Sequence, residues 1–419
     1  MRLFADLHIH SRFSKACSQD LNLQNLERWA LIKGLHILGT GDFTHPTWLN
    51  ELKQNLQQVT DDGIFSYGKI NFILTTEISN VYELDGKIKK IHHILLVPSF
   101  EVAEQINDYL SKFTNLSVDG RPTVRIASPK LVEDIKSISS KIEIIPAHAW
   151  TPHFALFGSK SGFDSLKECY EDKANEIHAI ESGMSSDPAM NWRLSALDKI
   201  QIVSFSDAHS YWPWRIGREA TIFDTELKYN KIINAIRTGE GLAGTIETSP
   251  EYGKYHFDGH RNCGVWMEPQ QSKKYNNRCP KCGKPLTIGV LNRVEQLADR
   301  PANYKPEKRP PFYTLLPLAE LLAASLGTKS VTAKPVLQIY NEMLERFSSE
   351  YAILMEAPPE QLSEIVTDDI VELIIKNRFG KLTVQPGYDG VYGKLLLEKN
   401  ASNKMQQMAS EQKSLFDYN

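Results

Sequence analysis

Histidines and carboxylates recur near the ends of apolar runs in the first half of the chain. The earliest example is ADLHIHS, residues 5–11, where Asp6, His8 and His10 occupy alternate positions. Alternate residues of an extended strand point to the same face. Later runs carry similar residues at their ends: Asp42, Glu77, His93, His148, Glu181, Asp207 and His209. Imidazole and carboxylate without thiolate suit Zn, Mn or Fe at a catalytic centre better than a structural zinc.

Seven apolar runs rich in Ile, Val and Leu predict the strands that position these ligands. They cover residues 3–10, 36–43, 70–79, 91–98, 142–148, 176–181 and 200–209. Such runs suit a parallel sheet buried on both faces, and helical stretches such as 21–34 lie between several of them. Repeated βα units form a doubly wound sheet or a barrel, and a barrel brings its strand ends to one mouth. The pattern therefore predicts an α/β fold with a β/α barrel, and more than four ligands there imply more than one ion.

A second ligand set of different chemistry follows the barrel. The set consists of two short pairs, His260-x-x-Cys263 and Cys279-x-x-Cys282, which lie sixteen residues apart. Two such knuckles predict a structural zinc, because four protein ligands leave no open position for a substrate. His256 is an alternative fourth ligand. Clustered cysteines without a disulfide framework or a secretory signal predict a cytoplasmic protein.

Charge is unevenly distributed along the chain, and a basic segment is either a solvated face or a surface that contacts phosphates. The net charge is −3, but residues 268–309 hold ten Lys or Arg against four Asp or Glu. A basic segment on a zinc-stabilised platform favours contact with a nucleic-acid backbone. Amphipathic stretches after a Pro-rich connector predict a helical domain. The expected division is a catalytic barrel at 1–245, a zinc-binding domain at 246–297, a helical C-terminal domain at 298–398 and a flexible tail at 399–419.

Six motifs resemble those of the PHP (polymerase and histidinol phosphatase) family. They are DLHIHS (6–11), GDFTHP (41–46), TTEIS (75–79), IHHILL (91–96), PAHAW (146–150) and SDAH (206–209). The resemblance implies a seven-stranded distorted β/α barrel and a trinuclear metal site for phosphoester hydrolysis. It places one ion on the following residues: His8, His10, Glu77 and Asp207.

The same resemblance assigns two further ions. Glu77 would bridge to a second ion held by His93 and His148, since the match to H-I-L favours His93 over its neighbour His92. A third ion would use His209 with a residue of GDFTHP, where His45 is favoured and Asp42 is the alternative.

The whole layout is similar to endonuclease Q, a DNA-repair nuclease family with a PHP barrel, a zinc-binding domain and a helical C-terminal domain. The similarity is most specific at ESGMSSDPAMNWR (181–193), DGHRNC (258–263) and the 279–301 stretch. It implies cleavage of DNA on the 5′ side of uracil, hypoxanthine, xanthine or an abasic site. It also implies two or three divalent ions (Zn, Mn, Fe or Mg) in the barrel, with catalytic roles for Asp207, Glu77 and His148.

A damaged base must leave the stack to be read, which requires a pocket beside the metal site. We expect Ser185 and Asn191 to supply hydrogen bonds, Trp192 a stacking surface, and His153 part of the lining. The alternative is a loop that its own Asx and Ser turns stabilise.

The tail ends in a short motif that resembles the bacterial sliding-clamp-binding peptide, Q-x-(S/D)-L-F. Gln412, Leu415 and Phe416 carry the match. A short apolar anchor on a flexible tail suits a clamp pocket, so a sliding clamp is an expected partner. Two other functions fit the same sequence: a small-molecule phosphoesterase of the histidinol phosphatase kind, and a clamp-associated DNA-binding scaffold.

Overall fold

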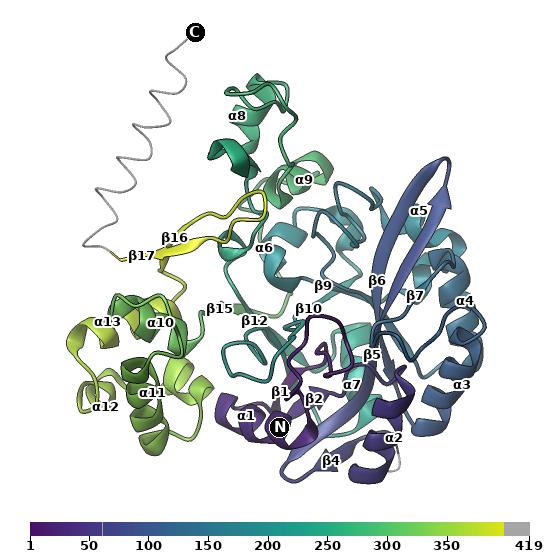
Figure 1. Ribbon diagram of the computed structural model, residues 1–419, viewed down its shortest axis with the longest axis horizontal. Helices are drawn as coiled ribbons and strands as arrows, with labels where there is room; N and C mark the ends of the chain where they lie inside the picture. The colour runs from purple at the N-terminus through teal and green to yellow at the C-terminus, as the bar shows by residue number, and fades with distance from the viewer. Residues whose placement is uncertain (61, 398–419) are drawn as a thin grey trace.

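Strands occupy the positions of all seven apolar runs in the computed structural model, which describes residues 1–60 and 62–397 (Figure 1). They are β1 (Arg2–Asp6), β2 (Ile37–Gly39), β5 (Ile70–Leu84), β6 (Lys87–Val97), β8 (Glu143–Pro146), β9 (Ala179–Glu181) and β10 (Gln201–Val203). β1, β2 and β5 are parallel neighbours, and so are β9 and β10. A parallel bridge between Ile9 and Ala208 makes the first and last members of the series neighbours as well.

The β5–β6 pair departs from the expected parallel arrangement. β6 is antiparallel to both β5 and β8. Only Asp85 and Gly86 separate β5 from β6, and both have positive φ, at 51° and 70°. A two-residue turn of this kind joins antiparallel strands, whereas a parallel pair needs a long crossover. The result is a long hairpin that carries Glu77 and His92 in the middle of its strands rather than at their ends.

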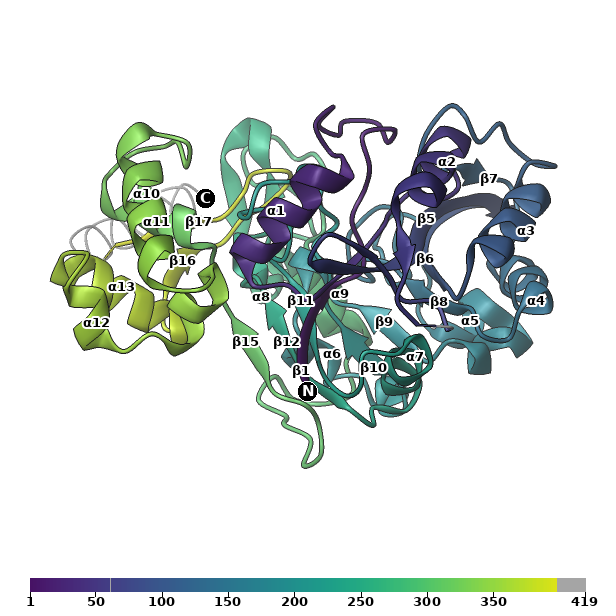
Figure 2. The ribbon, with the colours of Figure 1, turned by 90° about the horizontal axis from the view of Figure 1, so that it is seen from below.

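Further strands and helices complete a mixed α/β body. The added strands are β3 (Gln57–Gln58), β4 (Phe65–Tyr67), β7 (Thr123–Val124), β11 (Ala220–Asp224), β12 (Leu242–Glu247) and β15 (Phe312–Thr314). The helices are α1 (Leu23–Lys33), α2 (Pro46–Asn55), α3 (Phe100–Leu110), α4 (Ser128–Ile138), α5 (Leu166–Tyr170), α6 (Pro188–Asn191) and α7 (Tyr229–Thr238). Figure 2 shows α3, α4 and α5 on the outer side of the β5, β6 and β8 strands. Their apolar faces bury residues such as Ile106 and Ile135 against the sheet.

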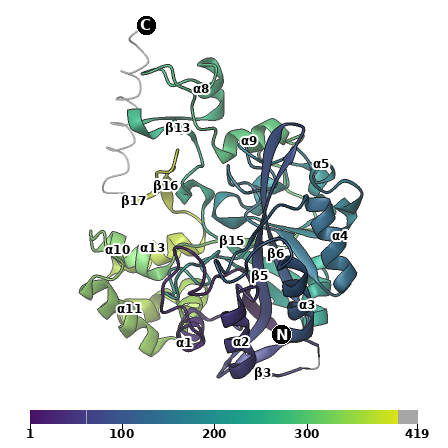
Figure 3. The same ribbon diagram turned by 45° about the vertical axis from the view of Figure 1, so that its right-hand side comes forward.

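A small module, in which α8 lies farthest from this body, stands out from the rest of the chain (Figure 3). It contains β13 (Asp258–His260), β14 (Val265–Met267), α8 (Pro269–Lys274) and α9 (Val290–Leu297). Its core is limited to a few side chains, chiefly Val265, Met267, Cys279 and Leu286. Arg293 joins the module to the body, because its guanidinium donates to the carbonyls of Phe157 and Phe163 at 3.0 Å.

The C-terminal part is helical, and it packs against the start of the chain. Its elements are α10 (Leu318–Ser325), α11 (Lys334–Arg346), α12 (Pro359–Ser363), α13 (Asp368–Arg378) and the hairpin of β16 (Thr383–Gln385) and β17 (Lys394–Leu396). Helix α1 ends, as expected, at Gly34, whose φ is 97°. There the buried Lys33 ammonium lies 2.7 Å from Glu350. β15 lies within the expected helical domain, yet it pairs with β12 and so extends the main sheet.

No helix among residues 1–60 and 62–397 is both long enough and apolar enough to cross a membrane.

Candidate metal centre

Two groups of potential metal ligands meet at one glutamate. The ligand atoms within each group all lie within 4.8 Å of one another. The first group is His8, His10, Glu77 and Asp207, and the second is Glu77, His92 and His148. Each carboxylate oxygen of Glu77 faces a different group. Its Oε2 is 3.3 Å from His10 Nε2, while its Oε1 is 2.6 Å from His92 Nδ1 and 3.2 Å from His148 Nε2. Glu77 thus offers one carboxylate oxygen to each of the two ligand groups.

Two further carboxylates orient the histidines of the first group. His10 Nδ1 donates to Asp42 at 2.9 Å, and His8 Nδ1 donates to Glu181 at 3.0 Å. Both rings therefore present Nε2 to the centre, and a carboxylate behind a histidine is the usual support of a metal-binding imidazole. The buried His8 Nε2 has no hydrogen-bond partner among the described residues. An unpartnered ring nitrogen beside two carboxylates fits a bound cation.

The backbone is strained where it presents these side chains. Asp42, His148 and Asp207 have φ of 49°, 32° and 50°, in the left-handed region that L-residues rarely adopt. All three follow closely after strand ends, where a sharp change of direction turns the side chain into the centre. Such conformations cost on the order of 1–3 kcal/mol each and concentrate at functional sites. A Cβ at Gly183 would come within 2.9 Å of the His148 Cβ, so a glycine is needed at that turn.

The charges of the centre stabilise one another. Burial acts to raise the pKa of Asp207, but the hydrogen bond from His10 and the charge of His8 hold that pKa below its ordinary value. Burial acts to raise the pKa of Glu77 as well, but the charge of His8 and the hydrogen bonds with His10 and His148 hold that pKa well below its usual range. Burial lowers the pKa of His92 to about 4. A neutral imidazole is the form that binds a metal ion.

Arg121 is a functional candidate that the sequence reasoning missed. Its Nη1 lies 3.0 Å from Glu77 Oε2, and its side chain is 26% exposed. It lies in the segment between α3 and α4, where no motif or periodicity marks it, so only the tertiary structure could have found it. Glu181 was noted as a strand-end carboxylate, and the structure gives it the role of orienting His8.

The structure corrects the choice of His93 over His92. His93 donates from Nδ1 to Asn80 at 3.0 Å, and its Nε2 accepts a hydrogen bond from the Tyr170 hydroxyl at 2.8 Å. In the β5–β6 register His92 is opposite Ser79, two residues from Glu77, so His92 and Glu77 share a face. His93 therefore points to the other face of the hairpin and takes no part in the centre.

The third-ion residues belong to neither ligand group. His45, favoured as a ligand, stacks on Phe13 at 4.3 Å between ring centroids, and its Nε2 is 3.3 Å from the Ser117 carbonyl. Asp42, its alternative, binds His10 instead. His209 lies against His10, with ring centroids 4.6 Å apart, and its Nδ1 donates to the Asp207 carbonyl at 2.8 Å.

Asp6, the first polar residue of the ADLHIHS motif, also belongs to neither ligand group. Its carboxylate accepts hydrogen bonds from the Ser206 backbone at 2.9 Å, the Ser206 hydroxyl at 2.6 Å and the Gly217 backbone at 2.8 Å. Ser206 immediately precedes Asp207. Asp6 thus fixes the turn that presents a ligand, and burial raises its own pKa to about 6.

The comparisons with known proteins place the chain in a family. The family model described as the MJ0043 C-terminal domain matches residues 317–381. The uncharacterized protein MJ0043 of Methanocaldococcus jannaschii is 34% identical over 254 residues, which span 59% of this chain but only 31% of that protein. The lesion-specific endonuclease PfuEndoQ of Pyrococcus furiosus has a TM-score of 0.84 and 31% identity, covering 96% of this chain and 99% of its own. The chain belongs to the endonuclease Q family.

A second endonuclease Q structure, a complex with a 27-mer duplex that has an abasic lesion at the active site, is equally similar. Its TM-score is 0.84 with 32% identity, over 95% of this chain and 98% of that one. The expectation of an endonuclease Q family member is thereby confirmed.

The expected base-reading residues of this endonuclease Q chain differ in how exposed their side chains are. Asn191 is fully buried: its Oδ1 accepts from Trp150 at 2.7 Å, and its Nδ2 donates to Ser186 and the Asp187 carbonyl. Its amide is therefore occupied by contacts within the protein, and its expected role in reading a base stays a prediction. The ring of Trp192 packs against Phe312 in an edge-to-face arrangement, with 5.7 Å between the ring centroids.

The side chains of Ser185 and His153 are at least partly exposed to solvent. Ser185 lies half-buried in the 183–185 turn, which is packed against His148. His153 is exposed, and it lines a groove beside the β5–β6 hairpin. Their roles toward substrate remain predictions.

The four expected zinc ligands do come together in this endonuclease Q chain. The ligand atoms of His260, Cys263, Cys279 and Cys282 lie within 4.8 Å of one another. One imidazole and three thiolates fit a closed tetrahedral zinc site. His256, the alternative, lies outside this group, and burial lowers its pKa to about 4. The clamp-like residues Gln412, Leu415 and Phe416 lie outside the described residues.

Proposed function

We propose that this chain is a metal-dependent DNA endonuclease that hydrolyses the phosphodiester on the 5′ side of a deaminated base or an abasic site. The observation that carries the proposal is Glu77, whose two oxygens face two separate ligand groups. Family membership adds support, since a relative has been seen with a lesion-containing duplex at its active site. Uracil, hypoxanthine and xanthine are the proposed bases.

Divalent ions at these two groups would lower the pKa of a bound water and offset the charge that develops on the phosphate. His8, His10 and Asp207 would hold one ion, and His92 and His148 the other, with Glu77 between them. The pair accounts for two of the two or three ions proposed. The proposed ions are Zn, Mn, Fe or Mg.

The protein's own groups prepare this chemistry. Asp42 and Glu181 fix the imidazoles, so that little rearrangement is needed when the substrate arrives. Arg121 offers a guanidinium at the rim, where it can donate to non-bridging phosphate oxygens. Asp207, with a side chain 34% exposed, lies where the centre opens to solvent.

The test uses four labelled duplexes that each contain one lesion: uracil, hypoxanthine, xanthine or an abasic site. The chain is stripped of metal and reloaded separately with Mg, Mn, Fe or Zn. We expect a nick 5′ of the lesion, lost in Asp207→Asn. Hydrolysis of histidinol phosphate without any DNA nick would favour the small-molecule phosphoesterase. DNA binding without cleavage, unchanged in Asp207→Asn, would favour the scaffold.

A further inference from the structure

A basic groove of about 680 Å³ runs along the outer part of the β5–β6 hairpin. Its other walls are the loop after β8 and helix α9 of the zinc module. The positively charged residues that line it are Lys87, Lys89, Lys90, Lys160 and Arg293. Asp164 is the acidic residue of the lining, and it is already paired with Arg293. The groove therefore has a clear excess of positive charge.

The lysines of the groove have no acidic partners among the residues that the structure describes. Within residues 1–60 and 62–397, none of Lys87, Lys89, Lys90 and Lys160 forms an ion pair with a carboxylate. Lys89 is fixed in place, since its ammonium donates to the Gly162 carbonyl at 2.6 Å and lies 4.0 Å from the Phe163 ring centroid. Lys87 and Lys160 are exposed. Clustered cations without counter-charges on the protein are an electrostatic footprint for phosphates.

The groove leads directly to the metal centre. Lys90 lies two residues before His92 on the same strand and so points to the same face, about 7 Å along the strand. Phe154 lies between them: its ring centroid is 4.8 Å from that of His92 and 5.2 Å from the Lys90 ammonium. The loop backbone follows the strand edge, since the N–H groups of His92 and Lys90 donate to the carbonyls of Phe154 and Ser161 at 3.1 Å. A chain of phosphates that leaves the centre past Phe154 would enter the groove.

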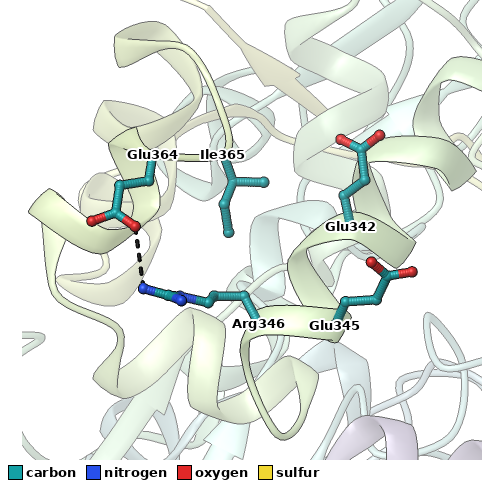
Figure 4. A pocket seen from close by; sticks show the side chains of 5 residues that line it. All are labelled: Glu342, Glu345, Arg346, Glu364 and Ile365. Carbon is teal, nitrogen blue, oxygen red and sulfur yellow. Dashed lines mark hydrogen bonds and ion pairs between the residues drawn. The ribbon is translucent and has the colours of Figure 1, made fainter.

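A second pocket has a lining of the opposite charge. It has a volume of about 460 Å³ in the helical domain, and Figure 4 shows three glutamates around a single arginine. There Arg346 is already paired with Glu364 at 3.2 Å. The acidic lining would repel a polyanion, so it offers no comparable path for DNA.

We propose that the basic groove binds the phosphodiester backbone of the DNA substrate outside the linkage that is cut. This rests on the proposed endonuclease function and specifies where the flanking strand lies. The groove adds affinity and orientation and takes no part in the reaction. Sequence readout is not required, because contacts of this kind recognise phosphates and are sensitive to salt.

The test compares Lys87→Ala/Lys160→Ala with the wild-type chain in single-turnover cleavage of a uracil duplex. The half-saturating enzyme concentration and the maximal rate are measured at several NaCl concentrations. We expect half-saturation to rise about tenfold, its logarithmic salt slope to fall by up to about 1.8 for two lost phosphate contacts, and the maximal rate to stay within about twofold. Lys87→Arg/Lys160→Arg should restore both values.

The matched control is Lys112→Ala/Lys231→Ala, which removes two exposed lysines outside the groove. If both double alanine variants show the same half-saturation and salt slope, the groove proposal is wrong. If the wild-type chain does not cleave at all, the proposed function fails. Fluorescence anisotropy of the same duplex then decides the groove separately, with a tenfold weaker Kd for Lys87→Ala/Lys160→Ala supporting it and an unchanged Kd overturning it.

Discussion

The hydroxyl of Tyr351 donates a hydrogen bond to the carbonyl of Gly217 at 2.5 Å, and this contact joins the helical domain to the metal centre. The N–H of Gly217 donates in turn to Asp6 at 2.8 Å. Asp6 holds Ser206 through its backbone and hydroxyl, and Ser206 precedes the ligand Asp207. The C-terminal part of the chain therefore supports the turn that presents Asp207.

Tyr351→Phe should weaken metal binding as well as the fold. The change leaves the buried Gly217 carbonyl without its partner, which costs about 1–3 kcal/mol in the free energy of unfolding. The Asp207 turn loses support, so we expect a several-fold weaker Kd for Mn, measured by calorimetry on metal-stripped protein. Tyr340→Phe is the matched control, because its hydroxyl donates to Glu350 at 2.7 Å and not to this chain of contacts. Equal Mn affinities in both variants would contradict the prediction.

His92→Gln and His93→Gln should separate the two adjacent histidines. The first variant should lose one divalent ion per chain and at least about a hundredfold in cleavage rate, because it removes a ligand that faces Glu77. The second should keep its metal content and lose mainly stability, since the ring nitrogens of His93 bond to Asn80 and Tyr170. Metal content by mass spectrometry and thermal unfolding give the two readouts. Full metal loading in His92→Gln would contradict the assignment.

The sequence predicted features that depend on local pattern. The seven strands were found because each is a short run of apolar residues, and His8, His10, Glu77, His148 and Asp207 follow from residue type and motif. The zinc ligands follow from spacing alone. These features can be predicted from the sequence because each depends on a pattern within a few consecutive residues.

Features that depend on register or distant packing were missed. The choice between His92 and His93 requires the pairing of Ser79 with His92, which no motif records. Asn191 looked free for a base, but a tryptophan 41 residues away occupies its amide. β15 has three residues after a Pro-rich connector, too few to show any period.

Cys282→Ser should remove one zinc ion per chain without disturbing the main body. Cys282 is exposed, so the substitution leaves the apolar packing of the module intact while it removes one of four ligands. We expect faster proteolysis within 258–289, because the few buried side chains there cannot hold the fold alone. Cys169→Ala, at a buried cysteine outside the zinc group, is the control and should keep the zinc. Unchanged zinc content in Cys282→Ser would show that the four residues do not bind it.

Glu247→Gln should flatten the pH dependence of stability above pH 5. Burial raises the pKa of Glu247 from 4.5 to about 8, with Asp187 adding to the rise, and burial beside Glu247 also raises that of Glu219. The unfolded chain releases this proton above about pH 4.5, whereas the folded chain keeps it until about pH 8. The contribution of Glu247 to the free energy of unfolding is therefore fully present below its pKa in the unfolded chain, about 4.5. It falls as the pH rises from there to about 8.

The decline is at most about 1.4 kcal/mol per pH unit for one carboxyl. The glutamine keeps a neutral side chain beside Ser182 and Ser204, whose hydroxyls lie 2.8 and 3.1 Å from Glu247. The free energy of unfolding of the variant should thus rise relative to that of the wild type between pH 5 and pH 8. Urea denaturation measures this difference. Some slope should remain, because Glu219 still titrates. Glu240→Gln, at an exposed site, is the control and should follow the wild type. A constant difference between Glu247→Gln and wild type across this range would mean that Glu247 is ionised throughout it.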